Sequence, residues 1–174
     1  SSDGPRGPAA HPTRGGARRA PPPLSPRAGD PVTGRGPDGA SPGVLFLCVH
    51  NAGRSQMAAA FARHLGGDRV TILSAGSAPA ASVNPVAVEA MSELGIDITG
   101  VAPRRWAAGD LERVDVVVTM GCGDECPVVP GTRYLDWPLT DPAGQDLAVV
   151  RTVRDSIEAR VRELLTELDV VIDP

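Results

Sequence analysis

The sequence predicts an α/β fold in which helices cover both faces of a doubly wound, mostly parallel β-sheet. Short apolar runs typical of strands alternate along the chain with longer segments that have a helical period. The stretch 115–120 holds a continuous apolar run between polar flanks, as expected for a central parallel strand that is buried on both faces. In such sheets ligands bind beyond the carboxyl ends of the strands.

The first strand and the helix after it hold the main candidate for chemistry. Val44 to Leu47 form an apolar run that predicts a buried strand, and strong helix formers follow in series from Gln56. Cys48 therefore ends a strand and Arg54 opens a helix. A loop of five residues lies between them.

The next two elements continue the alternation of strand and helix. A β-branched run at 70–73 predicts the second strand. Asn84 and Pro85 then begin a helix with the proline in its first turn, and Gly95 ends it. We assign its apolar stripe to four residues, namely Val86, Val88, Met91 and Leu94.

The remaining segments complete a sheet of four predicted strands. Residues 96–108 have no regular period, so we expect a loop with a short helical turn. After the strand at 115–120, a last short strand is predicted around 133–135 and a long helix from about 147 to 168. The apolar positions of that helix are Val150, Val153, Ile157, Val161, Leu164 and Leu168.

Composition divides the chain into a tail and one domain. Residues 1–43 are dominated by Pro, Gly, Ala and Arg and predict a disordered tail, which leaves a single domain at 44–170. The arginines of the tail are scattered and the net charge is -4, so we expect no nucleic-acid binding. The sequence has neither a signal-peptide core nor an apolar stretch of about 18 residues, which predicts a cytosolic protein without a membrane span.

The loop after the first strand predicts an anion site. A short turn from strand to helix directs several backbone N–H groups toward one point, and the positive end of the helix dipole lies there. A thiol at this point is favoured as the thiolate, so Cys48 is a candidate nucleophile. The planar guanidinium of Arg54 can bind two oxygens of a tetrahedral oxyanion.

Other residues near this loop fit the same chemistry. Asn51 and Gly53 tolerate a positive φ, and the Ser55 hydroxyl can donate to the sulfur. Asp141 follows a predicted strand and precedes Pro142. Local sequence leaves two interpretations of Asp141 open, a general acid and an ordinary Asp-Pro turn.

The three cysteines point to redox or nucleophilic chemistry. The strand at 115–120 delivers Cys122 to the same end of the sheet as Cys48, and Cys126 follows on the same loop. A zinc site made of His50 and the two later cysteines would have three ligands, whereas structural zinc sites usually have four. We therefore expect no bound metal.

The motifs together resemble a known family. From Val44 to about Leu168 the chain resembles the low-molecular-weight protein tyrosine phosphatase fold and, within it, the arsenate reductases that use this fold. The resemblance implies a four-stranded parallel sheet flanked by helices. It rests on Cys48–Ala58, Ser74–Gly76, Asn84-Pro85, Thr119–Cys122 and Asp141–Gly144.

The resemblance also implies roles for individual residues. Cys48 looks like the nucleophile, Arg54 the oxyanion clamp, Asn51 the residue that shapes the loop, Ser55 the stabiliser of the thiolate and Asp141 the acid. The implied substrate-binding loop consists of Val49, His50, Asn51, Ala52, Gly53, Arg54 and Ser55. Some reductases of this fold bind potassium through positions that here look like Ala59, Ala102 and Arg104, so we expect no such cation site.

For an arsenate reductase the resemblance implies a thiol relay. Cys48 attacks arsenate, Cys122 attacks the Cys48 sulfur, and Cys126 then takes over the disulfide, with thioredoxin as the reductant. Only three residues separate Cys122 from Cys126, fewer than is usual for this type. In the alternative route mycothiol and a small redoxin supply the electrons, and Cys48 alone is essential.

The late cysteines favour a reductase over a phosphatase of the same fold. Ala143, Gly144 and Gln145 also stand where tyrosine phosphatases of this fold typically carry aromatic residues. We therefore expect a monomeric arsenate reductase without a bound cofactor. A low-molecular-weight tyrosine phosphatase is the first alternative, and a non-enzymatic redox or arsenic-sensing module is the second.

Overall fold

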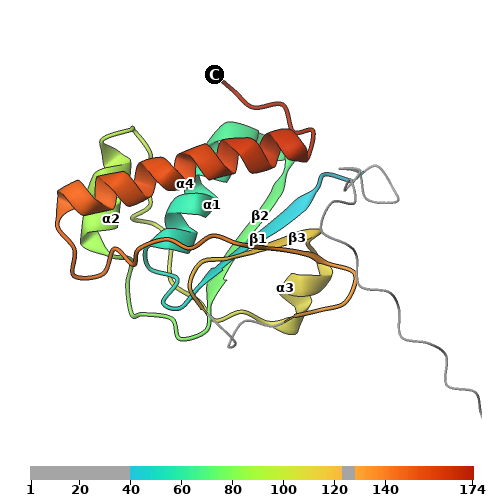
Figure 1. Ribbon diagram of the computed structural model, residues 1–174, viewed down its shortest axis with the longest axis horizontal. Helices are drawn as coiled ribbons and strands as arrows, with labels where there is room; N and C mark the ends of the chain where they lie inside the picture. Colours follow the sequence, from blue (N-terminus) through green and yellow to red (C-terminus); the bar gives the residue numbers. More distant parts are fainter. Residues whose placement is uncertain (1–39, 123–127) are drawn as a thin grey trace, which may run out of the picture.

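The computed structural model describes residues 40–122 and 128–174. Four strands form one parallel sheet in the order β2-β1-β3-β4 (Figure 1), which confirms the predicted fold class. The strands are β1 (Gly43–Cys48), β2 (Thr71–Gly76), β3 (Val116–Thr119) and β4 (Arg133–Asp136). The predicted tail as far as residue 39 and the predicted redox residue Cys126 lie outside the described residues.

Helices cover both faces of this sheet, as the sequence predicts. They are α1 (Arg54–Gly66), α2 (Pro85–Ser92), α3 (Ala108–Glu112) and α4 (Leu147–Glu167), with a 3₁₀ turn at Gly67–Arg69. α1, α2 and α4 lie over one face, and α3 lies on the other (Figure 1). Within the described ranges no helix is both long and apolar enough to cross a membrane.

β1 positions the candidate site because it lies inside the sheet and ends at its edge. All six residues of β1 are buried. Side chains alternate between the two faces of a strand, so Phe46 and Cys48 join the core under α1 and α4, whereas Leu45 and Leu47 pack on the side of α3. Cys48 is the last residue of the strand, as predicted, and it faces the α1 layer.

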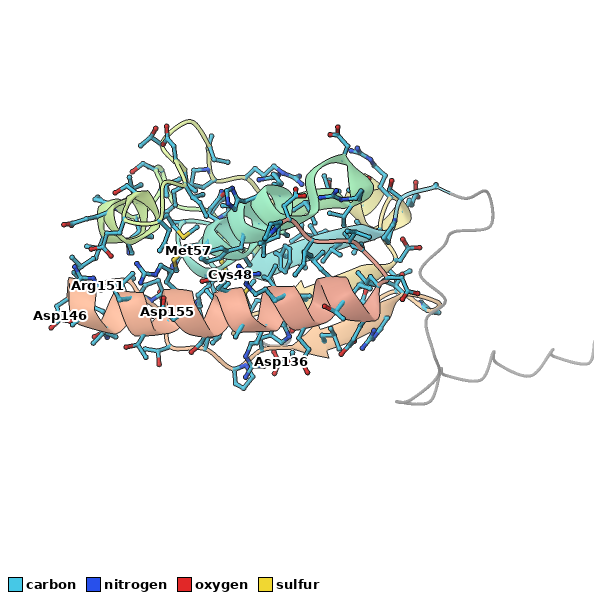
Figure 2. All side chains as sticks on the ribbon, turned by 90° about the horizontal axis from the view of Figure 1, so that it is seen from above. Cys48, Met57, Asp136, Asp146, Arg151 and Asp155 are labelled. Atoms are coloured by element: carbon cyan, nitrogen blue, oxygen red, sulfur yellow. The ribbon has the colours of Figure 1, made fainter. Side chains whose placement is uncertain are left out.

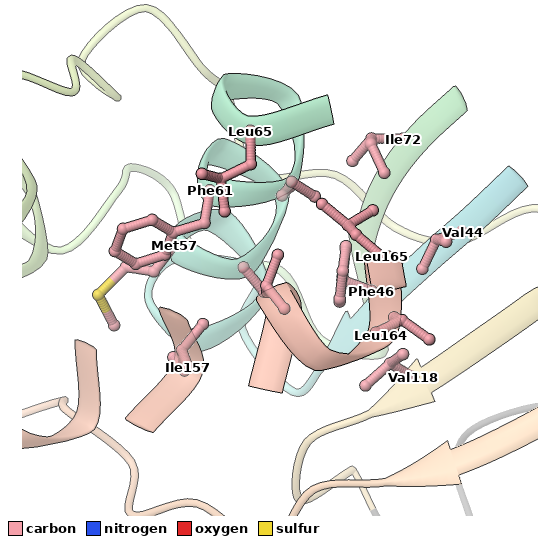
Figure 3. Close-up of a cluster of buried hydrophobic side chains, with 14 of the residues drawn as sticks. Val44, Phe46, Met57, Phe61, Leu65, Ile72, Val118, Ile157, Leu164 and Leu165 are labelled. Atoms are coloured by element: carbon pink, nitrogen blue, oxygen red, sulfur yellow. The ribbon is translucent and has the colours of Figure 1, made fainter. Parts of the chain in front are cut away.

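The larger core cluster lies between the sheet and the helix layer formed by α1 and α4. Phe46 of β1 and Met57 and Phe61 of α1 meet Ile157 and Leu165 of α4 there (Figure 3). Each of these side chains is at most 2% exposed. Fully burying side chains of this size contributes roughly 1.5–3 kcal/mol apiece, so this cluster fixes α1 on the sheet.

The long helix α4 follows its predicted pattern closely. Its predicted apolar positions are all buried. At its N-terminal end (Figure 2), the Asp146 carboxylate accepts a hydrogen bond from the Val149 N–H at 3.1 Å. This cap satisfies one of the backbone donors that a helix start leaves unpaired.

α2 buries only part of the predicted apolar stripe, which included Met91. Ala87, Ala90 and Met91 are buried, while Leu94, which we assigned to the apolar stripe, is 44% exposed. Leu94 lies beyond the end of the helix at Ser92, so the helical period does not extend to it. The small residues let α4 approach closely, and the Arg154 guanidinium donates to the Ala90 carbonyl at 2.8 Å.

α3 and the 3₁₀ turn are absent from the sequence prediction. α3 begins at Ala108, where the predicted irregular segment ends. The Asp110 carboxylate accepts the Ala107 N–H at 2.7 Å and both guanidinium nitrogens of Arg104 at 3.0 Å. Hydrogen bonds from residues three and six positions earlier in the chain to one carboxylate stabilise this short helix, and five residues are too few to display a helical period.

Candidate active site

The loop between β1 and α1 folds around Asn51. Asn51 adopts a left-handed backbone with φ of 48°, as predicted for this residue. Gly76 at the end of β2 leaves space for the loop, because a Cβ there would lie 2.5 Å from the Val49 carbonyl oxygen. The first turn of α1 then starts with the Met57 N–H donating to the Gly53 carbonyl at 2.9 Å.

Gly53 also tolerates a positive φ but does not adopt one. Its φ is -135°, outside the left-handed region. A glycine fits there for a different reason, since an added Cβ would lie 2.6 Å from Cγ of Pro142. The absence of a side chain thus lets the loop that carries Pro142 close over the start of α1.

The Cys48 sulfur accepts two hydrogen bonds inside the loop. The Asn51 backbone N–H lies 3.2 Å from Sγ, and the Ser55 hydroxyl oxygen lies 2.9 Å from it. Ser55 Oγ itself accepts a hydrogen bond from Asn51 Nδ2 at 2.8 Å, which leaves the hydroxyl hydrogen for the sulfur. Two hydrogen-bond donors therefore point at a sulfur that is only 2% exposed.

The orientation of the Asn51 amide follows from its other partners. Its Oδ1 accepts from the Arg104 backbone N–H at 3.0 Å and from Gln56 Nε2 at 3.2 Å. Because donors occupy the oxygen, the amide nitrogen must face Ser55. Asn51 is fully buried, so no water competes for these bonds.

Arg104 connects this network to α3. Its guanidinium forms the paired hydrogen bonds to Asp110 described above, while its backbone N–H serves Asn51. Burial raises the pKa of Asp110, but the hydrogen bonds from Arg104 and from the Ala107 N–H outweigh burial, and the pKa falls below its usual value. Asp110 therefore stays ionised and holds Arg104 in place at neutral pH.

Arg54 lies beside the thiol with its guanidinium almost fully buried. Nη1 donates to the Leu139 carbonyl oxygen at 3.2 Å, and Nη2 lies 3.4 Å from Asp141 Oδ2. Only 6% of the residue is exposed. Both partners come from the loop after β4, so a segment distant in the sequence holds the Arg54 guanidinium in place.

Asp141 forms the turn that one of its two sequence interpretations expected, and its second oxygen faces the site. Oδ1 accepts the Ala143 N–H at 2.9 Å, which is the turn, while Oδ2 lies near Arg54 and 3.9 Å from His50 Nδ1. The side chain is 43% exposed. One oxygen shapes the loop, and the other remains at the rim of the site.

A cavity of about 280 Å³ opens above the thiol. Its described lining includes no Phe, Tyr or Trp side chain. The lining residues are Cys48, His50, Ala52, Gly53, Arg54, Ala80, Ser82, Asn84, Asp141, Pro142 and Ala143. This space suits a small tetrahedral oxyanion, and its walls supply both a thiol and a guanidinium.

The sequence indicated part of this lining and left another part unmarked. Three residues of the predicted substrate loop do not line the cavity, namely Val49, Asn51 and Ser55. Asn51 and Ser55 are buried and are hydrogen-bonded to the Cys48 sulfur. Ala80 and Ser82 line it but had no sequence signal beyond their position after β2. Trp137, which precedes Asp141 closely in the sequence, packs against Phe46 with ring centroids 5.9 Å apart.

The comparison with protein families agrees with this architecture. The family model described as low molecular weight phosphotyrosine protein phosphatase matches residues 43–171. The chain belongs to this low molecular weight phosphatase family.

Several relatives within the low molecular weight phosphatase family are arsenate reductases by name. The chain is 42% identical over 124 residues to arsenate reductase 1 of Bacillus cereus, covering 69% of this chain and 91% of the relative. It is 38% identical over 128 residues to the glutaredoxin arsenate reductase of a Synechocystis strain, and this match covers 72% of this chain and 97% of the relative. A solved structure, the thioredoxin-dependent arsenate reductase Cg_ArsC1' of Corynebacterium glutamicum, is 42% identical with a TM-score of 0.68; the match covers 76% of this chain and 64% of that one.

The Cys122 side chain packs on the other side of the sheet from Cys48. It is buried in the smaller core cluster with Leu47 and Val117, on the α3 side of the sheet, whereas Cys48 belongs to the cluster on the opposite side. Cys48 is a free thiol, and Cys122 is disulfide-bonded. In the described ranges, no group of three or more His, Cys, Asp or Glu side chains is arranged to hold a metal ion.

Proposed function

We propose that this protein reduces arsenate to arsenite at Cys48. One observation carries the proposal. The free Cys48 thiol, which accepts hydrogen bonds from Ser55 and from the Asn51 N–H, lines the same cavity as Arg54, and this cavity suits a small oxyanion. Arsenate is a tetrahedral oxyanion that a guanidinium can bind through two oxygens. The arsenate reductases among the relatives support the choice of substrate.

The first step joins arsenic to the nucleophile. The Cys48 thiolate attacks arsenic(V), an S–As bond forms, and one arsenate oxygen leaves as water after protonation. Arg54 neutralises the charge on the remaining oxygens. Asp141 is proposed as the proton donor because its Oδ2 lies at the rim, 3.4 Å from the Arg54 nitrogen that would bind the substrate.

The second step transfers the electrons. A second thiol attacks the Cys48 sulfur, an S–S bond forms, and the S–As bond breaks with its electron pair left on arsenic. Arsenic is thereby reduced to As(III) and leaves as arsenite, while two thiols are oxidised to a disulfide. An external thiol system must then reduce this disulfide for another turnover.

We assign the second thiol to Cys122 and the next step of the relay to Cys126. In the described structure Cys122 packs on the α3 side and is disulfide-bonded, so it must be reduced and must leave that cluster before it can reach Cys48. Thioredoxin is our favoured final reductant, in line with the name of the Corynebacterium relative. A cytosolic location fits this proposal, because thiols are kept reduced there.

Phosphatase activity is the alternative for the same cavity, since a thiolate and an arginine also serve phosphoryl transfer. No Phe, Tyr or Trp among the described lining residues is available to stack on an aryl phosphate. Arsenate turnover with a thiol reductant should therefore exceed hydrolysis of an aryl phosphate when both substrates are saturating. The reverse ranking would reject the reductase assignment in favour of a phosphatase.

A further inference from the structure

Gly121 lies directly against the Arg54 guanidinium. A Cβ built on Gly121 would lie 2.6 Å from Arg54 Nη1, 3.6 Å from Cζ and 3.9 Å from Nη2. All three atoms belong to the guanidinium group, so no other side chain approaches this position as closely. Gly121 also has φ of +79°, a conformation that L side chains rarely adopt.

Arg54 has little freedom to move away from such an atom. Its Nη1 is held by the Leu139 carbonyl and its Nη2 by Asp141, and only 6% of the residue is exposed. A side chain at position 121 would therefore have to displace Nη1 from its carbonyl partner. The close packing of buried side chains leaves the cavity beside Cys48 as the open direction.

We propose that Gly121 is a positioning residue that sets the oxyanion affinity of the cavity by leaving room for the Arg54 guanidinium. The inference rests on the proposed function only in taking an oxyanion as the ligand, and it holds for phosphate as well as for arsenate. Gly121 itself does not contact the bound oxyanion. It acts through the place and direction of the two Arg54 nitrogens.

Other described glycines with positive φ provide a control, because they share the backbone conformation of Gly121 but contact no guanidinium. At Gly95, with φ of +74°, an added Cβ would have no atom within 4 Å, and Gly144 and Gly131 are equally open. An alanine at Gly95 thus carries the same left-handed strain without touching Arg54. Gly95→Ala is the matched control for Gly121→Ala.

The test measures binding of inorganic phosphate to the full chain by calorimetry. We expect Gly121→Ala to weaken phosphate binding roughly 10- to 100-fold, the equivalent of one charge-assisted hydrogen bond, and Gly95→Ala to leave it unchanged. Both variants carry the left-handed strain, and Gly121→Ala should lose more thermal stability because it also displaces Arg54 Nη1 from the Leu139 carbonyl. Equal phosphate affinity of Gly121→Ala and the unmodified chain would overturn the inference.

A second measurement separates a displaced arginine from a collapsed site. Iodoacetamide has no charge for Arg54 to bind, so Gly121→Ala should still be alkylated at Cys48, because the hydrogen bonds from Ser55 and Asn51 are intact. A parallel loss of alkylation would instead mean general collapse and reject the role in positioning. Neither readout uses arsenate reduction, so failure of the proposed function and failure of this inference are distinguishable.

Poor folding of Gly121→Ala is itself informative. The double variant Gly121→Ala with Arg54→Lys removes the Nη1 atom that the new Cβ would meet. If the single variant does not fold, the double variant should recover cooperative unfolding. Continued failure of the double variant to fold would locate the conflict elsewhere and overturn the inference.

Discussion

At the scale of single residues, the Cys48 sulfur depends on two donors that come from different parts of the loop. The sequence indicated both Ser55 and Asn51, because a hydroxyl in the first turn of α1 and a residue tolerant of positive φ are local signals. It could not indicate Arg104, whose backbone N–H orients the Asn51 amide from a distant segment. Local chemistry was predictable, and its long-range support was not.

The thiol and the clamp give the first prediction. Cys48→Ser should abolish arsenate turnover because it removes the nucleophile. Arg54→Ala should nearly abolish it because it removes the positive charge that binds the oxyanion. Ser55→Ala should slow alkylation of Cys48 at neutral pH by roughly 10-fold, the effect of losing one hydrogen bond to a charged group. Stopped-flow turnover and timed alkylation measure these effects; activity retained by Cys48→Ser would require another nucleophile.

The two oxygens of Asp141 give the second prediction. Asp141→Ala should reduce turnover by roughly 10²–10⁴, the usual contribution of a positioned acid. Asp141→Asn is the matched control, because its amide oxygen can still accept the Ala143 N–H and keep the turn. An equal loss in both variants assigns the effect to proton donation. Full activity of Asp141→Asn would show that Asp141 only stabilises the turn.

At the scale of elements, charged residues tie the end of α2 to α4. Glu93 accepts hydrogen bonds from Arg151 Nε at 3.0 Å and from Arg154 Nη1 at 2.8 Å. Figure 2 places Arg151 near the N-terminal end of α4. The hydrogen bond from Arg151, followed by that from Arg154, lowers the pKa of Glu93 from 4.5 to about 2.

This pKa gives a prediction about acid stability. Because the folded pKa is lower than the unfolded one, the contribution of Glu93 to stability is fully present above pH 4.5 and is lost as the pH falls toward about 2. Glu93→Gln should therefore lower the melting temperature at pH 6 but have a smaller effect near pH 2. Calorimetric scans across this pH range measure the difference; an equal effect at both pH values would contradict the ion pair.

Elements with a clear period were predictable, and short ones were not. The strand at β1 and the buried positions of α4 follow directly from runs and spacings of apolar residues. α3 has only five residues and depends on Asp110 and Arg104, so no periodic signal exists for it. The buried face of α2 was assigned only in part: Met91 was predicted, whereas Ala87 and Ala90 were missed because alanines pack there in place of larger apolar residues.

At the scale of the whole molecule, the order of strands and helices predicted the parallel sheet and the edge where the site lies. It did not predict on which face each cysteine would pack. The bend after β3 includes Gly121 with a positive φ, and Cys122 then joins the cluster on the α3 side. A period-two pattern ends with its strand, so it carries no information about residues beyond such a bend.

The source of electrons is the prediction that belongs to the whole molecule. Under the proposed relay, Cys122→Ser should stop multiple turnover with thioredoxin, and Cys126→Ser should trap a Cys48–Cys122 disulfide that mass spectrometry detects after arsenate is added. Under the mycothiol route both variants should keep turning over with mycothiol and its redoxin. Full activity of Cys122→Ser with thioredoxin as the only reductant would reject the relay.

The packing of Cys48 and Cys122 on opposite faces makes the sheet a partition between two redox states. The free Cys48 thiol packs in the cluster on one side and the disulfide-bonded Cys122 in the cluster on the other, so an exchange between the two sulfurs needs Cys122 to leave its cluster. Exchange has to pass around the carboxyl edge of the sheet. Under the proposed relay the protein can therefore hold an oxidised Cys122 while Cys48 stays reduced, and the release of Cys122 from its cluster would control when the two sulfurs react.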